Sequence, residues 1–184
     1  MLWVQGCDLG CPGCFNPATH AASGVSRPVD AVAEQVLAAL TDDHAGVTFS
    51  GGEPFQQAEA TAELADRLRA ARPGAHLMAF SGYRLEDLRG PAAPPGAADL
   101  LATLDALVDG PFDPRRARAR PWRASTNQRL WIIGRPLPTC AFEAAPPEAE
   151  LHLAADGAVL LSGYPDAGLR ALVRQMGGDP RDDG

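Results

Sequence analysis

The sequence contains no lysine, and all 16 of its basic residues are arginine. Acidic residues number 23, which gives a formal net charge of −7 at pH 7. Such a chain has no overall basic field to attract a nucleic-acid backbone, so we expect no nucleic-acid partner. No apolar run approaches the roughly 20 residues of a membrane span, so we expect no membrane partner either. The first residues lack the basic and apolar segments of a signal peptide, which favours a cytoplasmic location.

Cysteine is also scarce, but its distribution is uneven. Three of the four cysteines, Cys7, Cys11 and Cys14, lie within eight residues of one another. In a reducing compartment such a cluster indicates metal or redox chemistry rather than disulfides. With 184 residues, of which 46% are hydrophobic, the chain is long enough for one domain with its own core. We therefore expect a single domain over residues 1–184.

Short apolar runs alternate with helical patterns along the chain, which favours an α/β fold with parallel strands. Strands are predicted at residues 2–5, 46–50, 76–80, 106–108 and 130–133. Helices are predicted at residues 28–40, 57–72, 85–88 and 99–104, with Ser26 as the cap of the first. A hairpin is predicted around Ala155-Asp156-Gly157, between strands at 150–154 and 158–161, followed by a last helix at 166–176.

The three clustered cysteines leave three interpretations open. Structural zinc takes four protein ligands, so His20 or Cys140 would have to supply the fourth. A 4Fe-4S cluster that only transfers electrons also takes four thiolates, in spacings that differ from Cys-x3-Cys-x2-Cys. A cluster held by three thiolates leaves one iron open to a substrate or cofactor, as an enzyme requires. Gly6, Gly10 and Gly13 would let the backbone fold tightly around a bulky inorganic core.

A second motif follows further along the chain. The strand predicted at 46–50 runs into Gly51-Gly52-Glu53-Pro54, which places two glycines and a carboxylate at the C-terminal end of a strand. In parallel α/β sheets and barrels this edge is where ligands bind. The glycines allow a ligand to come close, and Glu53 offers an acceptor for a cationic amine. A zinc ribbon needs no such element, so the two motifs together favour the enzyme.

The two motifs resemble the paired signature of the radical S-adenosylmethionine enzymes, and the pair is far more specific than either half. Within that superfamily, the chain looks like the anaerobic ribonucleotide reductase activating proteins, which are glycyl-radical-enzyme activases. The residues that carry this resemblance are Gln5-Gly6-Cys7, Cys11-Pro12-Gly13-Cys14-Phe15-Asn16-Pro17, Phe49-Ser50-Gly51-Gly52-Glu53-Pro54-Phe55-Gln56-Gln57, Ser81-Gly82-Tyr83, Leu107-Val108-Asp109-Gly110-Pro111-Phe112 and Ser125-Thr126-Asn127-Gln128-Arg129. The resemblance covers a core over residues 1–133, which leaves 134–184 as a C-terminal extension.

The resemblance implies a cluster, a reaction and a partner. Cys7, Cys11 and Cys14 would be the metal ligands and catalytic residues, each binding one iron of a 4Fe-4S cluster. The fourth iron would bind S-adenosyl-L-methionine, whose reductive cleavage yields methionine and a 5′-deoxyadenosyl radical. In the activases this radical removes a hydrogen atom from a backbone glycine of a glycyl radical enzyme. The implied partner is anaerobic ribonucleotide reductase, and the implied electron donor is of the flavodoxin or ferredoxin type.

The resemblance also implies the cofactor site and the fold. Gly51, Gly52 and Glu53 would hold the methionine amino group of S-adenosyl-L-methionine, and Ser81 and Gly82 would lie near the same cofactor. The fold would be an incomplete parallel βα barrel of the radical S-adenosylmethionine type, with a C-terminal β-hairpin and helix. A complete eight-stranded barrel needs about 250 residues, which this chain does not have.

Two other functions stay open at this point. Another radical S-adenosylmethionine enzyme, acting on a peptide or small molecule, would share every residue of the cluster site. A non-catalytic iron-sulfur or zinc-binding protein would need the cysteines but not Glu53. A run of arginines is expected to form a solvated face, with docking to the partner as the alternative: Arg115, Arg116, Arg118, Arg120 and Arg123. Cys140 is expected to be a buried or loop thiol outside the site.

Overall fold

The computed structural model describes residues 1–120, 122–136, 149–153 and 159–163, together with single helical positions at 168, 172 and 175. Its strands are β1 (Leu2–Val4), β2 (Gly46–Gly51), β3 (His76–Phe80), β4 (Ala106–Asp109), β5 (Ala117–Arg120), β6 (Arg123–Ser125), β7 (Arg129–Ile132), β8 (Ala149–Leu153) and β9 (Val159–Gly163). Its helices are α1 (Val29–Ala39), α2 (Ala58–Ala71), α3 (Leu85–Leu88) and α4 (Ala97–Thr103), with 3-10 turns η1 (Pro17–Thr19), η2 (Pro54–Gln57) and η3 (Pro114–Arg116).

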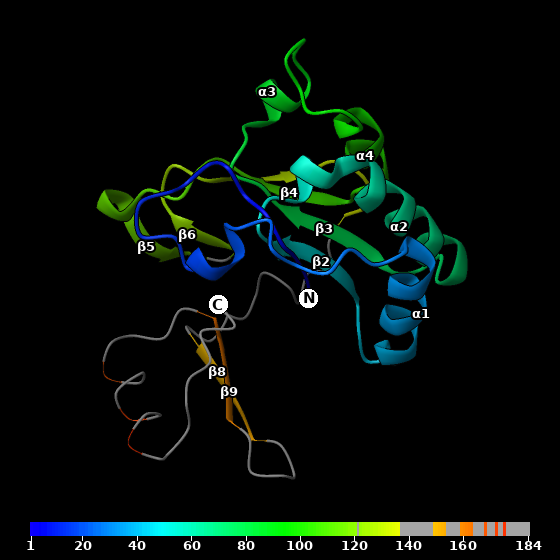
Figure 1. Cartoon of the computed structure of the whole chain (residues 1–184), viewed down its shortest axis with the longest axis horizontal. Helices are drawn as coiled ribbons and strands as arrows, with labels where there is room; N and C mark the ends of the chain where they lie inside the picture. The colour runs from blue at the N-terminus through cyan, green and yellow to red at the C-terminus, as the bar shows by residue number, and fades with distance from the viewer. Residues whose placement is uncertain are drawn as a thin grey trace.

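A five-stranded sheet in the order β1-β2-β3-β4-β7 forms the centre of the fold (Figure 1). Strands β1 to β4 are parallel, with Val4 opposite Gly51 and Phe49 opposite Ala79. This confirms the predicted α/β class. The sheet is not parallel throughout, because β7 pairs antiparallel with β4. A parallel return needs a crossover, usually a helix, whereas the segment from β4 to β7 forms the antiparallel β5–β6 pair instead.

Helices α1, α2 and α4 lie beside the parallel strands and cover one face of the sheet (Figure 1). On that face Phe49, Leu77 and Leu107, from three adjacent strands, have no exposed surface. They belong to one core cluster with Leu68 of α2 and Leu100 of α4. Burying a Leu or Phe side chain fully contributes about 1.5–3 kcal/mol, so this layer is the main source of stability.

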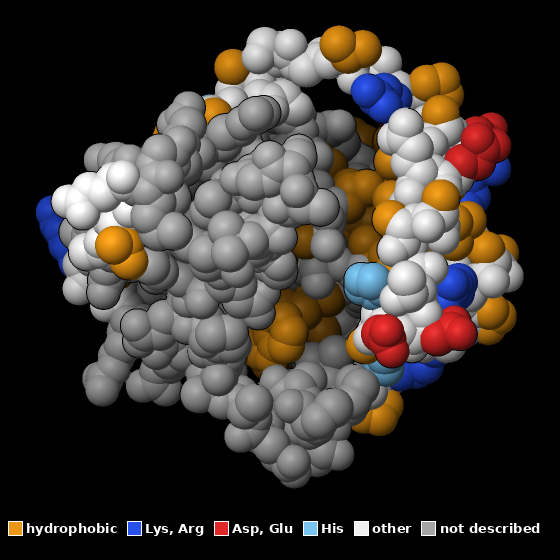
Figure 2. Space-filling model, turned by 90° about the horizontal axis from the view of Figure 1, so that it is seen from below, with side chains coloured by type: hydrophobic (Ala, Val, Ile, Leu, Met, Phe, Trp, Pro, Cys, Tyr) orange, Lys and Arg blue, Asp and Glu red, His pale blue; other side chains and the backbone are white. Residues whose placement is uncertain are grey.

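The remaining apolar surface of the sheet is smaller and less covered. Met78, Ala106 and Val108 form a second buried cluster. Trp3 on β1 and Ile132 on β7, the two edge strands, are 40% and 47% exposed. Seen from below, hydrophobic side chains show on the inner side of the band of described residues at the right, and most of the charged side chains in view lie along the outer side of that band (Figure 2). Within the described part of the chain, no helix has the length and apolarity needed to cross a membrane.

One local prediction is wrong, and two local features were not predicted. The N-cap of α1 is Pro28, with no side-chain hydrogen bond, so Ser26 does not cap this helix. Proline favours the start of a helix and disfavours helical geometry in the residue before it, which leaves Ser26 too far from the first turn. Helix α2 begins at Ala58, because residues 54–57 form the separate turn η2. The arginine-rich segment forms the β5–β6 hairpin, for which the sequence carries no strand pattern.

The predicted C-terminal hairpin is confirmed, because β8 and β9 pair antiparallel with Leu151 opposite Leu161. Its turn at 155–157 lies outside the described residues. The predicted helix at 166–176 also lies outside them, apart from its three single positions. The same holds for Cys140.

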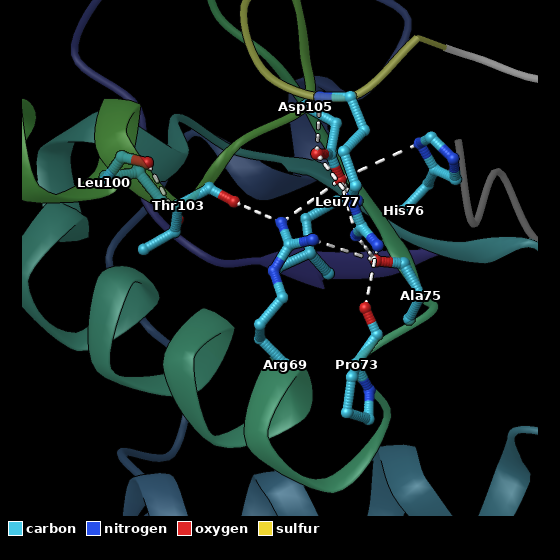
Figure 3. Close-up of polar contacts among 9 residues, drawn as sticks. Arg69, Pro73, Ala75, His76, Leu77, Leu100, Thr103 and Asp105 are labelled. Carbon is cyan, nitrogen blue, oxygen red and sulfur yellow. Dashed lines mark hydrogen bonds and ion pairs between the residues drawn. The ribbon is translucent and has the colours of Figure 1, made fainter.

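The end of the sheet opposite the cysteine loop is held by the buried carboxylate of Asp105 (Figure 3). Its Oδ2 atom accepts hydrogen bonds from the backbone N–H of Leu77 at 2.9 Å and from Arg69 Nη2 at 3.1 Å. Its Oδ1 atom accepts from the backbone N–H of Arg135 at 3.0 Å and from its Nε at 3.2 Å. One carboxylate thus joins β3, α2 and the residues that follow β7.

We expect Asp105→Ala to lower the free energy of unfolding by about 1–3 kcal/mol, because it leaves the buried N–H of Leu77 without its acceptor and removes one acceptor each from Arg69 and Arg135. Chemical denaturation followed by circular dichroism measures the loss. The exposed Asp99, on α4, provides a control whose replacement by alanine should change stability little. Equal stability losses in the two variants would contradict the role given to Asp105.

Candidate active site

The three cysteines lie in the loop between β1 and η1. The N–H of Cys7 donates to the carbonyl oxygen of His20 at 3.0 Å, which joins the two ends of the loop. The N–H of Cys14 donates to the carbonyl oxygen of Cys11 at 3.1 Å, across a turn in which Gly13 has a φ of 68°. All three thiols are free and partly buried. The loop therefore presents its sulfur atoms from a closed and tightly turned backbone.

Gly51 and Gly52 allow the end of β2 to touch the cysteine loop. A Cβ atom on Gly52 would collide with the carbonyl oxygen of Gly6, and one on Gly51 would lie 2.6 Å from the carbonyl oxygen of Val4. Both carbonyls are used: the N–H of Gly52 donates to Val4 at 2.7 Å, and the N–H of Glu53 donates to Gly6 at 2.9 Å. The two glycines were expected to let a ligand come close. In the structure their lack of side chains lets the cysteine loop come close to the end of β2.

The carboxylate of Glu53 is buried, with 1% of the residue exposed. Its Oε1 atom accepts hydrogen bonds from the N–H of Phe55 at 3.0 Å and from Ser81 Oγ at 2.9 Å. Its Oε2 atom accepts from the N–H of Gly82 at 2.8 Å. A carboxylate has about four acceptor positions, so one remains for a ligand. Glu53 therefore ties the end of β2 to the turn that follows β3, a role that the sequence reasoning missed.

Burial raises the pKa of Glu53 from 4.5 to about 7, against the opposing effect of its three donors. A carboxyl group with a higher pKa in the folded chain than in the unfolded one holds its proton longer in the folded chain. Stability therefore falls as the pH rises from about 4.5 to about 7, and this contribution is constant above that window.

We expect the metal-free protein to lose about 2–3 kcal/mol of unfolding free energy through Glu53 between pH 5 and pH 8. Denaturant titrations at both pH values measure the loss. In the Glu53→Gln variant the side chain at this position cannot titrate. The loss of unfolding free energy between pH 5 and pH 8 should therefore be smaller than in the wild type by this amount. A variant with the same pH dependence as the wild type would contradict the raised pKa.

All eight residues predicted for the site line one open cavity of about 140 Å³. These residues are Cys7, Cys11, Cys14, Gly51, Gly52, Glu53, Ser81 and Gly82. Other segments add to the lining with Phe15, Asn16, His20, Gly110, Phe112 and Gln128. All of these except His20 lie within motifs that carried the resemblance. His20 has no ligand spacing in the sequence, so only the fold brings it to the cavity.

The donor set fits an iron-sulfur cluster. Burial raises the pKa of the Cys7 and Cys14 thiols, so iron must displace protons when it binds them. The N–H of Asn16 lies 3.3 Å from Cys14 Sγ and stabilises a thiolate there. Asn16 Oδ1 and His20 Nε2 are buried and have no hydrogen-bond partner among the described residues. Because such atoms destabilise a protein when unpaired, a ligand in the cavity would gain by pairing with them.

Zinc was the alternative occupant. Among the described ranges 1–120 and 122–136 and the hairpin strands, no group of three His, Cys, Asp or Glu side chains could hold one metal ion. Cys7, Cys11, Cys14 and His20 therefore do not converge closely enough in these ranges to hold a single ion. A site completed by Cys140 involves a residue outside them.

Comparison with known proteins agrees with this chemistry. The profile of a family described as a 4Fe-4S single cluster domain matches residues 1–131. The anaerobic ribonucleoside-triphosphate reductase-activating protein of Escherichia coli (strain K12) is 34% identical over 137 residues, which cover 69% of this chain and 83% of the relative. Proteins of the same name from Vibrio cholerae and Enterobacteria phage T4 are 32% and 29% identical over 133 and 134 residues. Those matches cover 69% and 71% of this chain, and 83% and 81% of the relatives.

The matching profile and the three free thiols define an iron-sulfur protein with a single 4Fe-4S cluster domain. The matched residues include the whole cysteine loop, the end of β2 and the turn after β3. More particularly, the chain belongs to the family of anaerobic ribonucleoside-triphosphate reductase-activating proteins. The resemblance found in the sequence motifs is therefore confirmed.

Proposed function

We propose that this protein is a radical S-adenosylmethionine enzyme that installs a glycyl radical on anaerobic ribonucleoside-triphosphate reductase. One observation carries the proposal: the cysteine loop, the end of β2 and the turn after β3 line a single cavity in a chain of this family. The names of the relatives support the partner, because they describe proteins that activate anaerobic ribonucleoside-triphosphate reductase.

In this proposal Cys7, Cys11 and Cys14 would hold the 4Fe-4S cluster, and a ligand set of three thiolates would leave the cluster open to S-adenosyl-L-methionine. A bound cluster would supply the one electron for reductive cleavage of S-adenosyl-L-methionine to methionine and 5′-deoxyadenosine, and a glycine of the partner would supply the hydrogen atom that this cleavage requires. The electron reaches the site from a donor of the flavodoxin or ferredoxin type.

The protein's own residues bind, orient and shield the cofactor. The free acceptor position of Glu53 binds the methionine ammonium group, and Gly51 and Gly52 leave room for it. The rings of Phe15 and Phe112 form an edge-to-face pair with centroids 5.8 Å apart, which keeps water from that wall of the cavity. Because Glu53 must be ionised to attract the ammonium group, binding should strengthen as the pH rises through about 7.

We extend the proposal to the fold and its setting. Strands β1 to β4 with their helices would be part of an incomplete barrel of the radical S-adenosylmethionine type. Support comes from four adjacent parallel strands with the candidate site at their C-terminal ends, where such folds bind ligands. Residues 1–133 would be the core and 134–184 an extension of the same domain, working in the cytoplasm.

The test is anaerobic reconstitution with iron and sulfide, reduction with dithionite, and chromatography for 5′-deoxyadenosine after addition of S-adenosyl-L-methionine. The wild type should form the product, Cys11→Ala should form none, and Glu53→Ala should form less. A complete cluster that yields no product, or a protein that retains zinc, would overturn the proposal. Product formation without a radical on the reductase would point to another substrate for the same chemistry.

A further inference from the structure

Three charged residues, Glu86, Asp109 and Arg129, do not line the cavity but stabilise one of its walls. Arg129, at the start of β7, lies directly opposite Asp109, at the end of β4. Its Nε donates to Asp109 Oδ1 at 3.0 Å and its Nη2 to Asp109 Oδ2. Its Nη1 and Nη2 also donate to the two carboxylate oxygens of Glu86, in α3, at 2.9 and 2.6 Å. Arg129 therefore links β4, β7 and α3 through one planar guanidinium group.

Asp109 extends this link to the turn after β3. It has no exposed surface, and its Oδ2 atom also accepts the N–H of Leu85, the first residue of α3, at 2.7 Å. The same turn is bonded to β4 and the residue after it. The N–H of Ser81 donates to a β4 carbonyl oxygen at 2.9 Å, and the N–H of Gly110 donates to the carbonyl oxygen of Tyr83 at 3.0 Å. Both ends of the turn are thus fixed to β4.

This turn, which forms part of the cavity wall, also binds the carboxylate of Glu53. Ser81 Oγ and the N–H of Gly82 are two of the three donors to that carboxylate. The space is tight, because a Cβ atom on Gly82 would collide with the side chain of Leu9 from the cysteine loop. A small displacement of the turn would therefore move both the carboxylate and the loop that it faces.

We infer that Asp109, Arg129 and Glu86 are positioning residues for the S-adenosyl-L-methionine site: they set the place of the Ser81-Gly82 turn, and hence the affinity for the cofactor, without touching it. The inference rests on the proposed function. It also gives a role to Arg129, which the sequence analysis named only as part of the resemblance.

The chain supplies a matched control at the other end of β4. Arg135 also donates to a buried aspartate, Asp105, and the two arginine side chains are almost equally exposed, at 38% for Arg135 and 39% for Arg129. Only the pair of Asp109 and Arg129 connects to the cavity wall. A lysine keeps the charge in either place but lacks the planar fork that spans two acceptors.

The experiment compares Arg129→Lys, Glu86→Gln and Arg135→Lys with the wild type. Equilibrium dialysis of the reconstituted proteins gives the dissociation constant for S-adenosyl-L-methionine, and thermal melting gives their stability. Hydrogen exchange of the metal-free proteins reports on the amides of Gly82 and Leu85. Arg129→Lys and Glu86→Gln should raise the dissociation constant, by about tenfold for Arg129→Lys, and speed exchange at both amides. Arg135→Lys should lower the melting temperature but leave binding and this exchange unchanged.

If Arg129→Lys and Glu86→Gln both bind S-adenosyl-L-methionine with wild-type affinity, this inference alone is overturned. The pair of Asp109 and Arg129 would then have a purely structural role. Equal weakening by Arg135→Lys would also overturn it, because the effect would then follow from general destabilisation. A reconstituted wild type that does not bind S-adenosyl-L-methionine would overturn the proposed function and this inference together.

Discussion

Replacing Gly52 by alanine is expected to abolish iron binding. The added Cβ atom would collide with the carbonyl oxygen of Gly6, the residue immediately before the first cysteine. That oxygen also accepts the N–H of Glu53 at 2.9 Å, so the collision breaks the junction between β2 and the cysteine loop. Neither side of the contact is a flexible side chain, so the backbone itself would have to move. Iron and acid-labile sulfide per chain, measured after anaerobic reconstitution, give the result.

The control for this variant is Gly74→Ala. A Cβ atom on Gly74 has no neighbour within 4 Å, so the variant should keep the iron content of the wild type. It should also be at least as stable, because alanine reduces the freedom of the unfolded chain. Full iron content in Gly52→Ala would contradict the close junction that this structure assigns to the site.

Replacing Cys11 by serine is the second change with a very large expected effect. It removes one of the three thiolates that face the cavity, and a serine hydroxyl is a poor substitute because it does not ionise at neutral pH. The visible absorbance of the reconstituted cluster should be lost, and cleavage of S-adenosyl-L-methionine should become undetectable. Absorbance spectra and chromatography of the reaction mixture measure both effects.

Cys140→Ser separates a three-thiolate ligand set from a four-thiolate one. In the account given above Cys140 is not a ligand, so this variant should keep both the absorbance and the cleavage activity. Loss of iron from Cys140→Ser as well as from Cys11→Ser would contradict an open iron, and would favour a four-thiolate cluster or a zinc site.

Much of the parallel sheet could be predicted from the sequence, because each strand is a short apolar run with a clear end. The strand expected at 46–50 is β2 and the strand expected at 76–80 is β3, each within one residue at either end. The site residues could be predicted because each group follows a strand at its C-terminal end. Parallel strands bring such ends to the same edge of the sheet, so segments distant in sequence converge on one cavity.

The remaining features depend on contacts that a single sequence does not record. The antiparallel direction of β7 follows from the arginine-rich hairpin before it, whose charge pattern gave no strand signal. Glu53 looked like a free acceptor, but three of its acceptor positions are occupied by Phe55, Ser81 and Gly82. The last two are far from Glu53 in the sequence. The partners of Arg129 are likewise known only once β4 and β7 are paired.

The most direct test of the central claim follows a hydrogen atom from the partner to the cofactor. Anaerobic ribonucleoside-triphosphate reductase labelled with deuterium at the α-carbon of glycine would be mixed with the reduced, reconstituted protein and S-adenosyl-L-methionine. Mass spectrometry of the 5′-deoxyadenosine and electron paramagnetic resonance of the reductase are then recorded. We predict 5′-deoxyadenosine that carries deuterium, together with a carbon-centred radical on the reductase. Unlabelled 5′-deoxyadenosine with no radical on the reductase would contradict the account.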